Sequence, residues 1–192
     1  MCGRYFTDDD IWEAVRHDFP LLSGTNPFMH RGDITPAMSA TSLAQGDDGV
    51  RAASLIWGFP GYDRKLIINA RAEGIEGKPT FAESLQQRRC VLPASGFYEW
   101  DRDKEKVTFT DPDAPVIYLA GIFRPYGDED RFVIITREAN ESMFPVHDRM
   151  PLMIRAEQVY DWIHDPAVTE EFLHQPLPQL EAKRDYEQLS LF

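Results

Sequence analysis

The sequence predicts an α+β fold whose core is mostly antiparallel β-sheet, arranged as a barrel or a sandwich with a few helices around it. Most apolar segments are short, rich in Val, Ile, Phe and Tyr, and bounded by clusters of Gly, Asp and Pro, which is the pattern of strands joined by turns. Segments with helical spacing of apolar residues are fewer. Closely spaced strands pair most simply as antiparallel neighbours, which favours a barrel or sandwich.

Nine segments carry the strand pattern, and we expect a β-strand in each: residues 42–44, 50–57, 66–71, 89–92, 96–100, 107–110, 116–123, 132–136 and 151–154. The stretch QGDDG at residues 45–49 is typical of the turns between them.

Four segments predict helices. The first spans residues 8–17, with Thr7 as its N-cap, acidic residues in its first turn, and an inner face formed by Ile11, Trp12 and Val15. The others span residues 81–87, 157–164 and 169–174, and prolines at 176 and 178 stop the last one.

The chain has 192 residues, of which 43% are apolar and 27% charged, so it suits one globular domain with its own core. We expect that domain to span residues 1–175, and residues 176–192 to form an acidic tail that packs on it or extends from it. No run of about 18 apolar residues occurs, and acidic residues stand where a secretory signal would be apolar. We therefore expect a monomeric cytoplasmic protein without membrane contact, in which Cys2 and Cys90 remain free thiols.

The formal net charge is −12, which argues against a general nucleic-acid binder because phosphate contacts are made by Lys and Arg. Charge is uneven along the chain. Residues 51–89 hold seven basic and four acidic side chains, whereas residues 156–192 hold two basic and eight acidic ones. An anion site is therefore expected on the first segment, joined by Arg4 and Arg149, although solvated surface charge explains the same pattern.

Cys2 follows the initiator methionine directly. Loss of Met1 would leave an α-amine of pKa ~7.7–8.0 and a thiol of pKa ~8.5 on neighbouring carbons. The amine forms a Schiff base with an aldehyde, and the thiol then closes a five-membered thiazolidine, helped by its proximity. The alternative is that Cys2 acts as a small apolar residue of a buried strand.

Polar residues elsewhere offer partners for this chemistry. On a strand, Asn69, Arg71 and Glu73 share one face, which is either hydrated or suited to hold a phosphate backbone. Glu99 lies between two aromatic residues, where loss of hydration favours proton exchange near neutral pH, although it also suits the rim of an edge strand. His147 lies in a loop beside Asp148, a setting typical of proton transfer, and Arg149 adds a cation.

Several sites are not predicted. No pair of Cys or His at metal-ligand spacing occurs, so no metal site is expected. No glycine-rich dinucleotide or phosphate loop and no G-x-S-x-G motif occurs either, so no cofactor is expected.

Five motifs in order resemble the SOS-response-associated peptidase family, the SRAP domain: MCGRY at residues 1–5, WGF at 57–59, NARAE at 69–73, RRCVLPASGFYEW at 88–100 and HDRMP at 147–151. The resemblance covers residues 2 to about 163. It implies a mostly β fold around a positively charged cleft that binds single-stranded DNA. It further implies an abasic-site sensor of the DNA damage response, whose N-terminal cysteine forms a thiazolidine with the ring-opened aldehyde of the lesion.

The resemblance also implies roles for individual residues. Cys2 would be the nucleophile, Asn69 would orient its amine and the sugar, Glu99 would shuttle protons, and His147 would assist Schiff-base formation and ring reversal. The residues implied to bind DNA are Arg4, Arg71, Arg149, Tyr62, Trp57 and Pro36. Where relatives often have Tyr-Asn, this chain has Asp33-Ile34, which removes a DNA contact.

Two other functions remain open at this point. A thiol peptidase or autopeptidase would use Cys2 as its nucleophile with His147 and Glu99, although no oxyanion-hole motif is visible. A non-covalent module for single-stranded DNA would need a long basic groove, which the net charge argues against.

Overall fold

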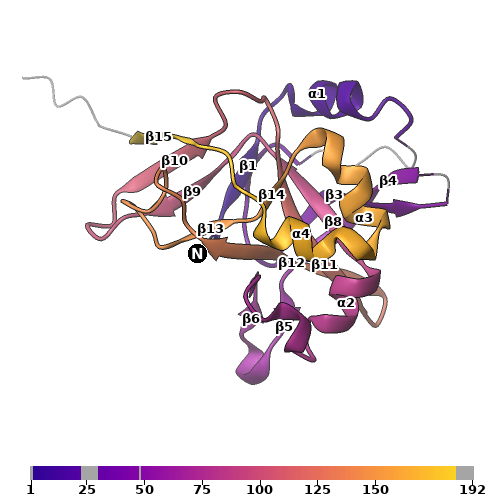
Figure 1. Cartoon of the computed structure of the whole chain (residues 1–192). Coiled ribbons are helices and arrows are strands. Elements are labelled where there is room, and N and C mark those ends of the chain that lie inside the picture. The colour runs from indigo at the N-terminus through magenta and orange to yellow at the C-terminus, as the bar shows by residue number, and fades with distance from the viewer. Residues whose placement is uncertain (1, 23–29, 48, 185–192) are drawn as a thin grey trace, which may run out of the picture.

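The computed structural model describes residues 2–22, 30–47 and 49–184 of the chain. It confirms the predicted fold class, because two β-sheets form most of the molecule and the α-helices in the described residues are short. Helices α2, α3 and α4 gather on one side of the molecule, and strands β9, β10 and β15 lie on the other (Figure 1).

Five long strands close into a barrel. Their order is β12-β4-β3-β8-β11, and β11 pairs again with β12 to complete the ring. The bounds are Ser39–Gly46 for β3, Gly49–Trp57 for β4, Arg89–Ala94 for β8, Ile117–Tyr126 for β11 and Glu129–Glu138 for β12. Four of them contain a predicted strand completely, and β11 covers the predicted strand at 116–123 except for Val116, because strands of this length show clear apolar patterns.

Strand β8 contributes side chains to the apolar clusters on both faces of the barrel sheet. All six of its residues are buried. Val91 packs in the cluster covered by the helices, whereas Cys90 and Leu92 pack in the cluster beneath the second sheet. Since successive side chains of a strand point to opposite faces, a strand covered on both faces is mostly apolar, and Arg89 is the one charged residue of β8.

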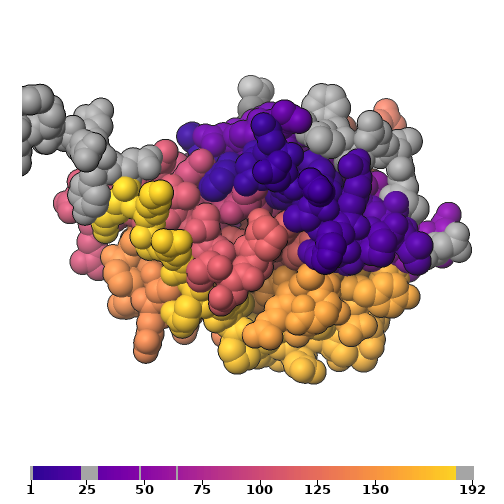
Figure 2. Space-filling model, turned by 90° about the horizontal axis from the view of Figure 1, so that it is seen from above, coloured from indigo at the N-terminus to yellow at the C-terminus, as the bar shows by residue number. Residues whose placement is uncertain are grey.

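The second sheet has the order β15-β10-β9-β1-β2. Its strands are Tyr5–Thr7 (β1), Gly32–Ile34 (β2), Gly96–Trp100 (β9), Lys106–Thr110 (β10) and Glu181–Arg184 (β15). The sequence pattern misses β1, β2 and β15, which are too short to show alternation. Part of the expected tail is thus a strand against β10, and Figure 2 shows this end of the chain lying along the surface. Residues 185–192 lie outside the described residues.

The remaining short strands surround the ends of β12. They are Phe59–Pro60 (β5), Leu66–Ile67 (β6), Asn69–Arg71 (β7), Arg149–Pro151 (β13) and Met153–Ile154 (β14). The expected strand at residues 66–71 is interrupted at Ile68, because β6 pairs with β5 and β7 pairs with β12. The pairing of β12 with β7 and with β4 is parallel, and this departs from the antiparallel arrangement of the other strands.

In the part of the chain that the structure describes, four α-helices lie close to their predicted positions. They span Ile11–Asp18 (α1), Ala82–Gln87 (α2), Val159–His164 (α3) and Thr169–His174 (α4). Single 3₁₀ turns cover Tyr62–Arg64, Ile75–Gly77, Ala156–Gln158 and Pro166–Val168. In α1 the buried residues are Ile11, Trp12 and Val15, as predicted.

The predicted N-cap of α1 is wrong. Thr7 is the last residue of β1, and its hydroxyl donates to the carbonyl of His30. The helix instead begins after Asp10, whose side chain makes no capping hydrogen bond.

Among the described residues, no helix is long and apolar enough to cross a membrane. Over the same residues, no group of three or more His, Cys, Asp and Glu side chains is arranged to hold a metal ion. Cys2 and Cys90 are both buried and form no disulfide.

Candidate functional site

Cys2 is separated from strand β1 by Gly3 and Arg4, and it is fully buried. Its neighbours in the apolar cluster include Tyr5, Trp57 and Phe97. Burial raises the pKa of the Cys2 thiol to about 12, and the charge of the Glu99 carboxylate adds to the rise. The thiol is therefore protonated at neutral pH in this structure, and any reaction at sulfur requires a nearby proton acceptor.

Asn69 is the polar group that contacts the backbone of Cys2. Its Nδ2 atom donates to the carbonyl oxygen of Cys2 at 2.9 Å. The parallel pairing of Asn69 with Ile134 of β12 holds it in place. The Oδ1 atom of Asn69 is buried and has no hydrogen-bond partner among the described residues. Since buried acceptors are normally satisfied, this oxygen is available to a donor.

Glu99 reaches the same place from the second sheet. The pairing of Tyr5 with Phe97 is extended by the hydrogen bond from the Tyr98 amide to the carbonyl of Arg4, at 3.0 Å. Continued by one residue, this antiparallel register sets Gly3 opposite Glu99. The Glu99 side chain is buried, and its charge acts on the Cys2 thiol. The structure thus brings Cys2, Asn69 and Glu99 together.

His147 lies in the turn that leads from β12 into β13. Its backbone amide donates to the carbonyl of Met143 at 3.0 Å, which fixes the turn. The ring lines a surface pocket of about 300 Å³, and the walls of this pocket also include Trp100, Arg102 and Phe144. Because Trp100 follows Glu99 directly, the pocket opens beside the strand that carries the Glu99 carboxylate.

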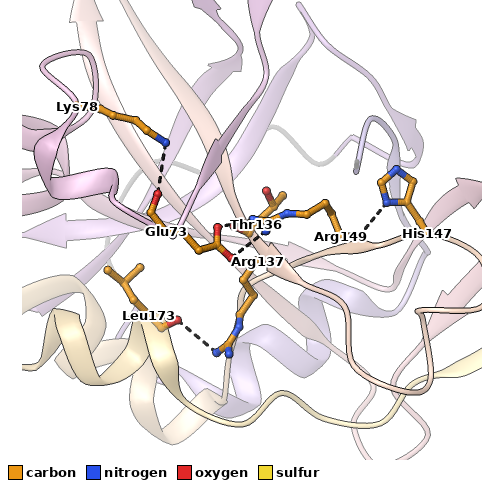
Figure 3. A network of polar contacts seen from close by, with 7 residues as sticks. All are labelled: Glu73, Lys78, Thr136, Arg137, His147, Arg149 and Leu173. Atoms are coloured by element: carbon orange, nitrogen blue, oxygen red, sulfur yellow. Dashed lines mark hydrogen bonds and ion pairs between the residues drawn. The ribbon is translucent and has the colours of Figure 1, made fainter.

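Arg149 is placed differently from the phosphate anchor that the sequence predicts. Its side chain is buried, and two of its guanidinium nitrogens donate to the two carboxylate oxygens of Glu73, each at 2.8 Å. One of these nitrogens, Nη2, also donates to the carbonyl of Thr136 at 2.6 Å. Figure 3 shows the two side chains facing each other. A guanidinium bound to a carboxylate in this way has few donors left for a phosphate, so this arrangement does not favour the predicted contact of Arg149 with DNA, which stays a prediction.

Arg4 and Arg71 remain accessible cations near the site. Arg4 forms an ion pair with Asp33 at 3.2 Å, in which both side chains are roughly half exposed. Its guanidinium also lies over the ring of Trp100, 5.5 Å from the ring centroid. Arg71 is exposed at the end of β7, two residues after Asn69.

The other residues implied to contact DNA differ in exposure. Trp57 is fully buried between Tyr5 and Phe132, and its Nε1 donates to the carbonyl of Ile68 at 2.9 Å. It therefore packs in the core of this structure, which does not favour a contact with DNA, and that contact stays a prediction. Tyr62 is 92% exposed, and Pro36 is partly exposed in the turn after β2.

One cation of the basic segment at residues 51–89, Arg89, has a structural role. Arg89 is buried and donates to the carbonyls of Leu85 and Gln86 at the end of α2 and to those of Trp162 and Ile163 in α3. The carbonyls at helix C-termini need such donors, and a guanidinium supplies several. The local excess of positive charge therefore does not identify an anion site by itself.

Two aromatic residues were not predicted as site residues. Trp100 is 39% exposed and Phe144 is 67% exposed, and both line the pocket that contains His147. For Trp100, the signal was its position after Glu99 on a strand whose alternate residues are buried. Nothing in the local sequence distinguishes Phe144 from a core residue.

The geometry can be compared with known proteins. A model of the SOS response associated peptidase (SRAP) family matches residues 1–189. The chain belongs to the SRAP family. This SRAP chain is 30% identical over 200 residues to the abasic site processing protein YoqW of Bacillus subtilis, covering 95% of this chain and 88% of that one. It is 30% identical over 179 residues to the abasic site processing protein YedK of Escherichia coli, covering 85% and 79%.

Solved structures share the SRAP fold. A protein from Bordetella bronchiseptica superimposes with a TM-score of 0.79 at 23% identity, covering 95% of this chain and 99% of that one. A phage-related protein from the same organism superimposes with a TM-score of 0.78 at 26% identity, covering 95% and 93%. The family resemblance derived from the five motifs is thereby confirmed.

Proposed function

We propose that this chain processes abasic sites, and that it captures the ring-opened aldehyde of such a site in single-stranded DNA through a thiazolidine on Cys2, after Met1 has been removed. The relatives named as abasic site processing proteins support this substrate. The observation that carries the proposal is the hydrogen bond of 2.9 Å between Asn69 and the carbonyl of Cys2. This bond attaches Cys2 to a carboxamide on a strand that is distant in the sequence. A polar contact of this kind favours a chemical role for Cys2 over a role in packing alone.

Removal of Met1 would complete the site. Met1 itself lies outside the described residues. Its loss turns the amide nitrogen of Cys2 into a primary amine, which donates hydrogen bonds. The carboxamide of Asn69, already bound to Cys2 through Nδ2, offers its buried Oδ1 as the acceptor. This pair of contacts would aim the amine at an incoming aldehyde.

The proposed reaction balances without an oxidant or a metal. The amine of Cys2 adds to the aldehyde carbon, and a Schiff base forms as one water leaves. The sulfur then bonds to the imine carbon, its proton passes to the nitrogen, and a five-membered ring closes. Since the thiol pKa is about 12, the proton must leave as sulfur attacks, and Glu99 is the carboxylate placed to relay it. His147 is proposed to protonate the departing oxygen from the side of the pocket.

DNA would be held by few contacts. Arg4 and Arg71 are accessible guanidiniums beside the site and would bind phosphates. The pocket between Trp100 and Phe144 offers aromatic faces to a base next to the lesion, and stacking of this kind does not depend on sequence. Because an abasic site has no base to read, such contacts suffice for recognition.

The test is incubation with a single-stranded oligonucleotide that carries one abasic site, using protein whose loss of Met1 has been verified by intact mass. We expect an adduct that survives denaturing electrophoresis, that is lost in Cys2→Ala, and that is lost in a preparation that retains Met1. An oligonucleotide without the lesion is the control. Absence of the adduct with correctly processed protein contradicts the proposal.

The same preparations separate the alternatives. A peptidase would cleave peptide substrates in a reaction that requires Cys2. A non-covalent module would retain undamaged strands in a salt-sensitive manner, and Cys2→Ala would not change this retention.

A further inference from the structure

We propose that Glu73 is a positioning residue that acts through Arg149 on His147 and sets which ring nitrogen of His147 carries the proton. The effect of Glu73 on rate rests on the proposed function, whereas its effect on the imidazole does not. The contacts that connect the three residues are drawn in Figure 3.

The first link is the pairing of Glu73 with Arg149. Two parallel N–H···O bonds of 2.8 Å join the planar guanidinium to the planar carboxylate, and this fork geometry fixes orientation as well as distance. The hydrogen bond from Arg149 lowers the pKa of Glu73 to about 2, so Glu73 is an anion at every pH near neutrality. Glu73 follows β7, whereas Arg149 is the first residue of β13, so the pair connects two strands at the end of β12.

The carbonyl of Thr136 reinforces this connection. It accepts from the Ala72 amide at 2.8 Å and from the guanidinium of Arg149 at 2.6 Å. Strand β12 thereby holds both the segment that carries Glu73 and the side chain of Arg149. Arg149, the first residue of β13, is therefore held by its side chain as well as by its backbone pairing with β12.

The second link runs from the backbone of Arg149 to His147. The Arg149 amide donates to Nδ1 of His147 at 2.9 Å. A neutral imidazole that accepts at Nδ1 carries its proton on Nε2, so this bond selects the Nε2–H form. The other ring nitrogen points away from Arg149 in Figure 3.

Asp148 supplies the opposing influence. Its Oδ1 lies 3.0 Å from the same Nδ1 of His147. A carboxylate oxygen cannot donate, so this contact becomes favourable only when Nδ1 carries a proton. The Arg149 amide and Asp148 therefore favour different proton positions on one ring. If Glu73 no longer fixes the position of Arg149, the hydrogen bond from the Arg149 amide to Nδ1 weakens. The contact with Asp148 then favours the proton on Nδ1, and Nε2 is left without one.

The experiment measures the imidazole directly by long-range ¹H–¹⁵N NMR at a pH where the ring is neutral. His147→Gln assigns the signals. We expect the Nε2–H form in the wild type and a shift toward the Nδ1–H form in Glu73→Gln. Glu73→Asp keeps the negative charge, so its tautomer should return toward that of the wild type. Asp148→Ala removes the acceptor oxygen beside Nδ1, so adding it to Glu73→Gln should restore the Nε2–H form.

The matched control is Glu83→Gln on helix α2. Glu83 pairs with Arg88 at 2.8 Å, so this change also removes a carboxylate from an arginine, but on a different element. We expect no change in the His147 signals. Unchanged His147 signals in Glu73→Gln, or equal changes in Glu73→Gln and Glu83→Gln, overturn the proposal.

Adduct formation gives the functional measurement. Glu73→Gln should slow the reaction with an abasic oligonucleotide about tenfold, which is less than the ~10²–10⁴-fold that a general acid–base group itself contributes, because Glu73 acts only through Arg149 on His147. Binding of an undamaged strand should stay within about twofold of wild type, because Glu73 is not proposed to touch DNA. If the wild type forms no adduct while Glu73→Gln still shifts the tautomer, the proposed function fails and the positioning role stands.

Discussion

The carboxylate of Asp33 pairs with the guanidinium of Arg4 at 3.2 Å, at the edge of the candidate site. A phosphate that binds Arg4 must displace Asp33, and the negative charge of Asp33 repels the same phosphate. The accessible cation is thus partly neutralised by the chain itself.

Asp33→Asn should therefore tighten binding of single-stranded DNA. An exposed ion pair contributes up to about 1 kcal/mol, so we expect affinity to rise about two- to fivefold at low salt. Fluorescence anisotropy with a labelled oligonucleotide measures this. The matched control is Asp9→Asn, which removes one charge from the exposed pair of Asp9 with Arg31 at 2.9 Å. An equal rise in both variants would show that only net charge matters.

Asn69→Ala should slow capture of an abasic-site aldehyde by at least about tenfold, because the amine of Cys2 loses the carboxamide proposed to aim it. The rate is followed as adduct formation over time on denaturing gels. Affinity for an undamaged strand should not change. A rate equal to that of the wild type would remove the role assigned to Asn69.

Arg89→Ala should destabilise the fold by about 3 kcal/mol, because it leaves several buried carbonyls of α2 and α3 without a donor. The midpoint of urea unfolding measures the loss. Arg31→Ala is the control, since Arg31 pairs with Asp9 on the surface, where both side chains are exposed, and should contribute less than about 1 kcal/mol. Comparable losses in the two variants would contradict the capping role of Arg89.

The pairing of Glu73 with Arg149 should appear in the acid stability of the protein. The folded pKa of Glu73, about 2, lies below its ordinary value of 4.5, so the folded state binds fewer protons at this group than the unfolded state. The contribution is complete above about pH 4.5 and is lost as the pH falls toward 2. Urea unfolding across this range should show Glu73→Gln less stable than wild type at pH 6, with the difference shrinking toward pH 2. A difference that does not depend on pH would contradict this assignment.

The sequence predicts the parts of this fold that are encoded locally. Strands β4 and β11 alternate or remain apolar over many residues, and the inner face of α1 is visible in the spacing of Ile11, Trp12 and Val15. Strands β1 and β2 are not visible, because three residues show no period and only pairing with each other makes them strands.

The site divides in the same way. The sequence motifs identify Cys2, Asn69, Glu99 and His147 as candidate site residues. The pairing of Arg149 with Glu73 does not, because the two residues are 76 positions apart and either could equally contact solvent or phosphate. Likewise, Trp57 ends a strand in a motif shared with relatives, and only the packing of Tyr5 and Phe132 against it shows that it is buried.

Strand β12 pairs with β4, β7, β11 and β13. Of these partners, β7 begins with Asn69 and β13 begins with Arg149. The Ile134 amide of β12 donates to the carbonyl of Ile68 at 3.1 Å inside this network. Its hydrogen should therefore exchange with deuterated water only when the whole molecule opens, whereas amides of the exposed turn at residues 101–105 should exchange early. Slow exchange at β12 would mean that the reacting groups keep their spacing through local fluctuations, so DNA would meet a site that is already assembled.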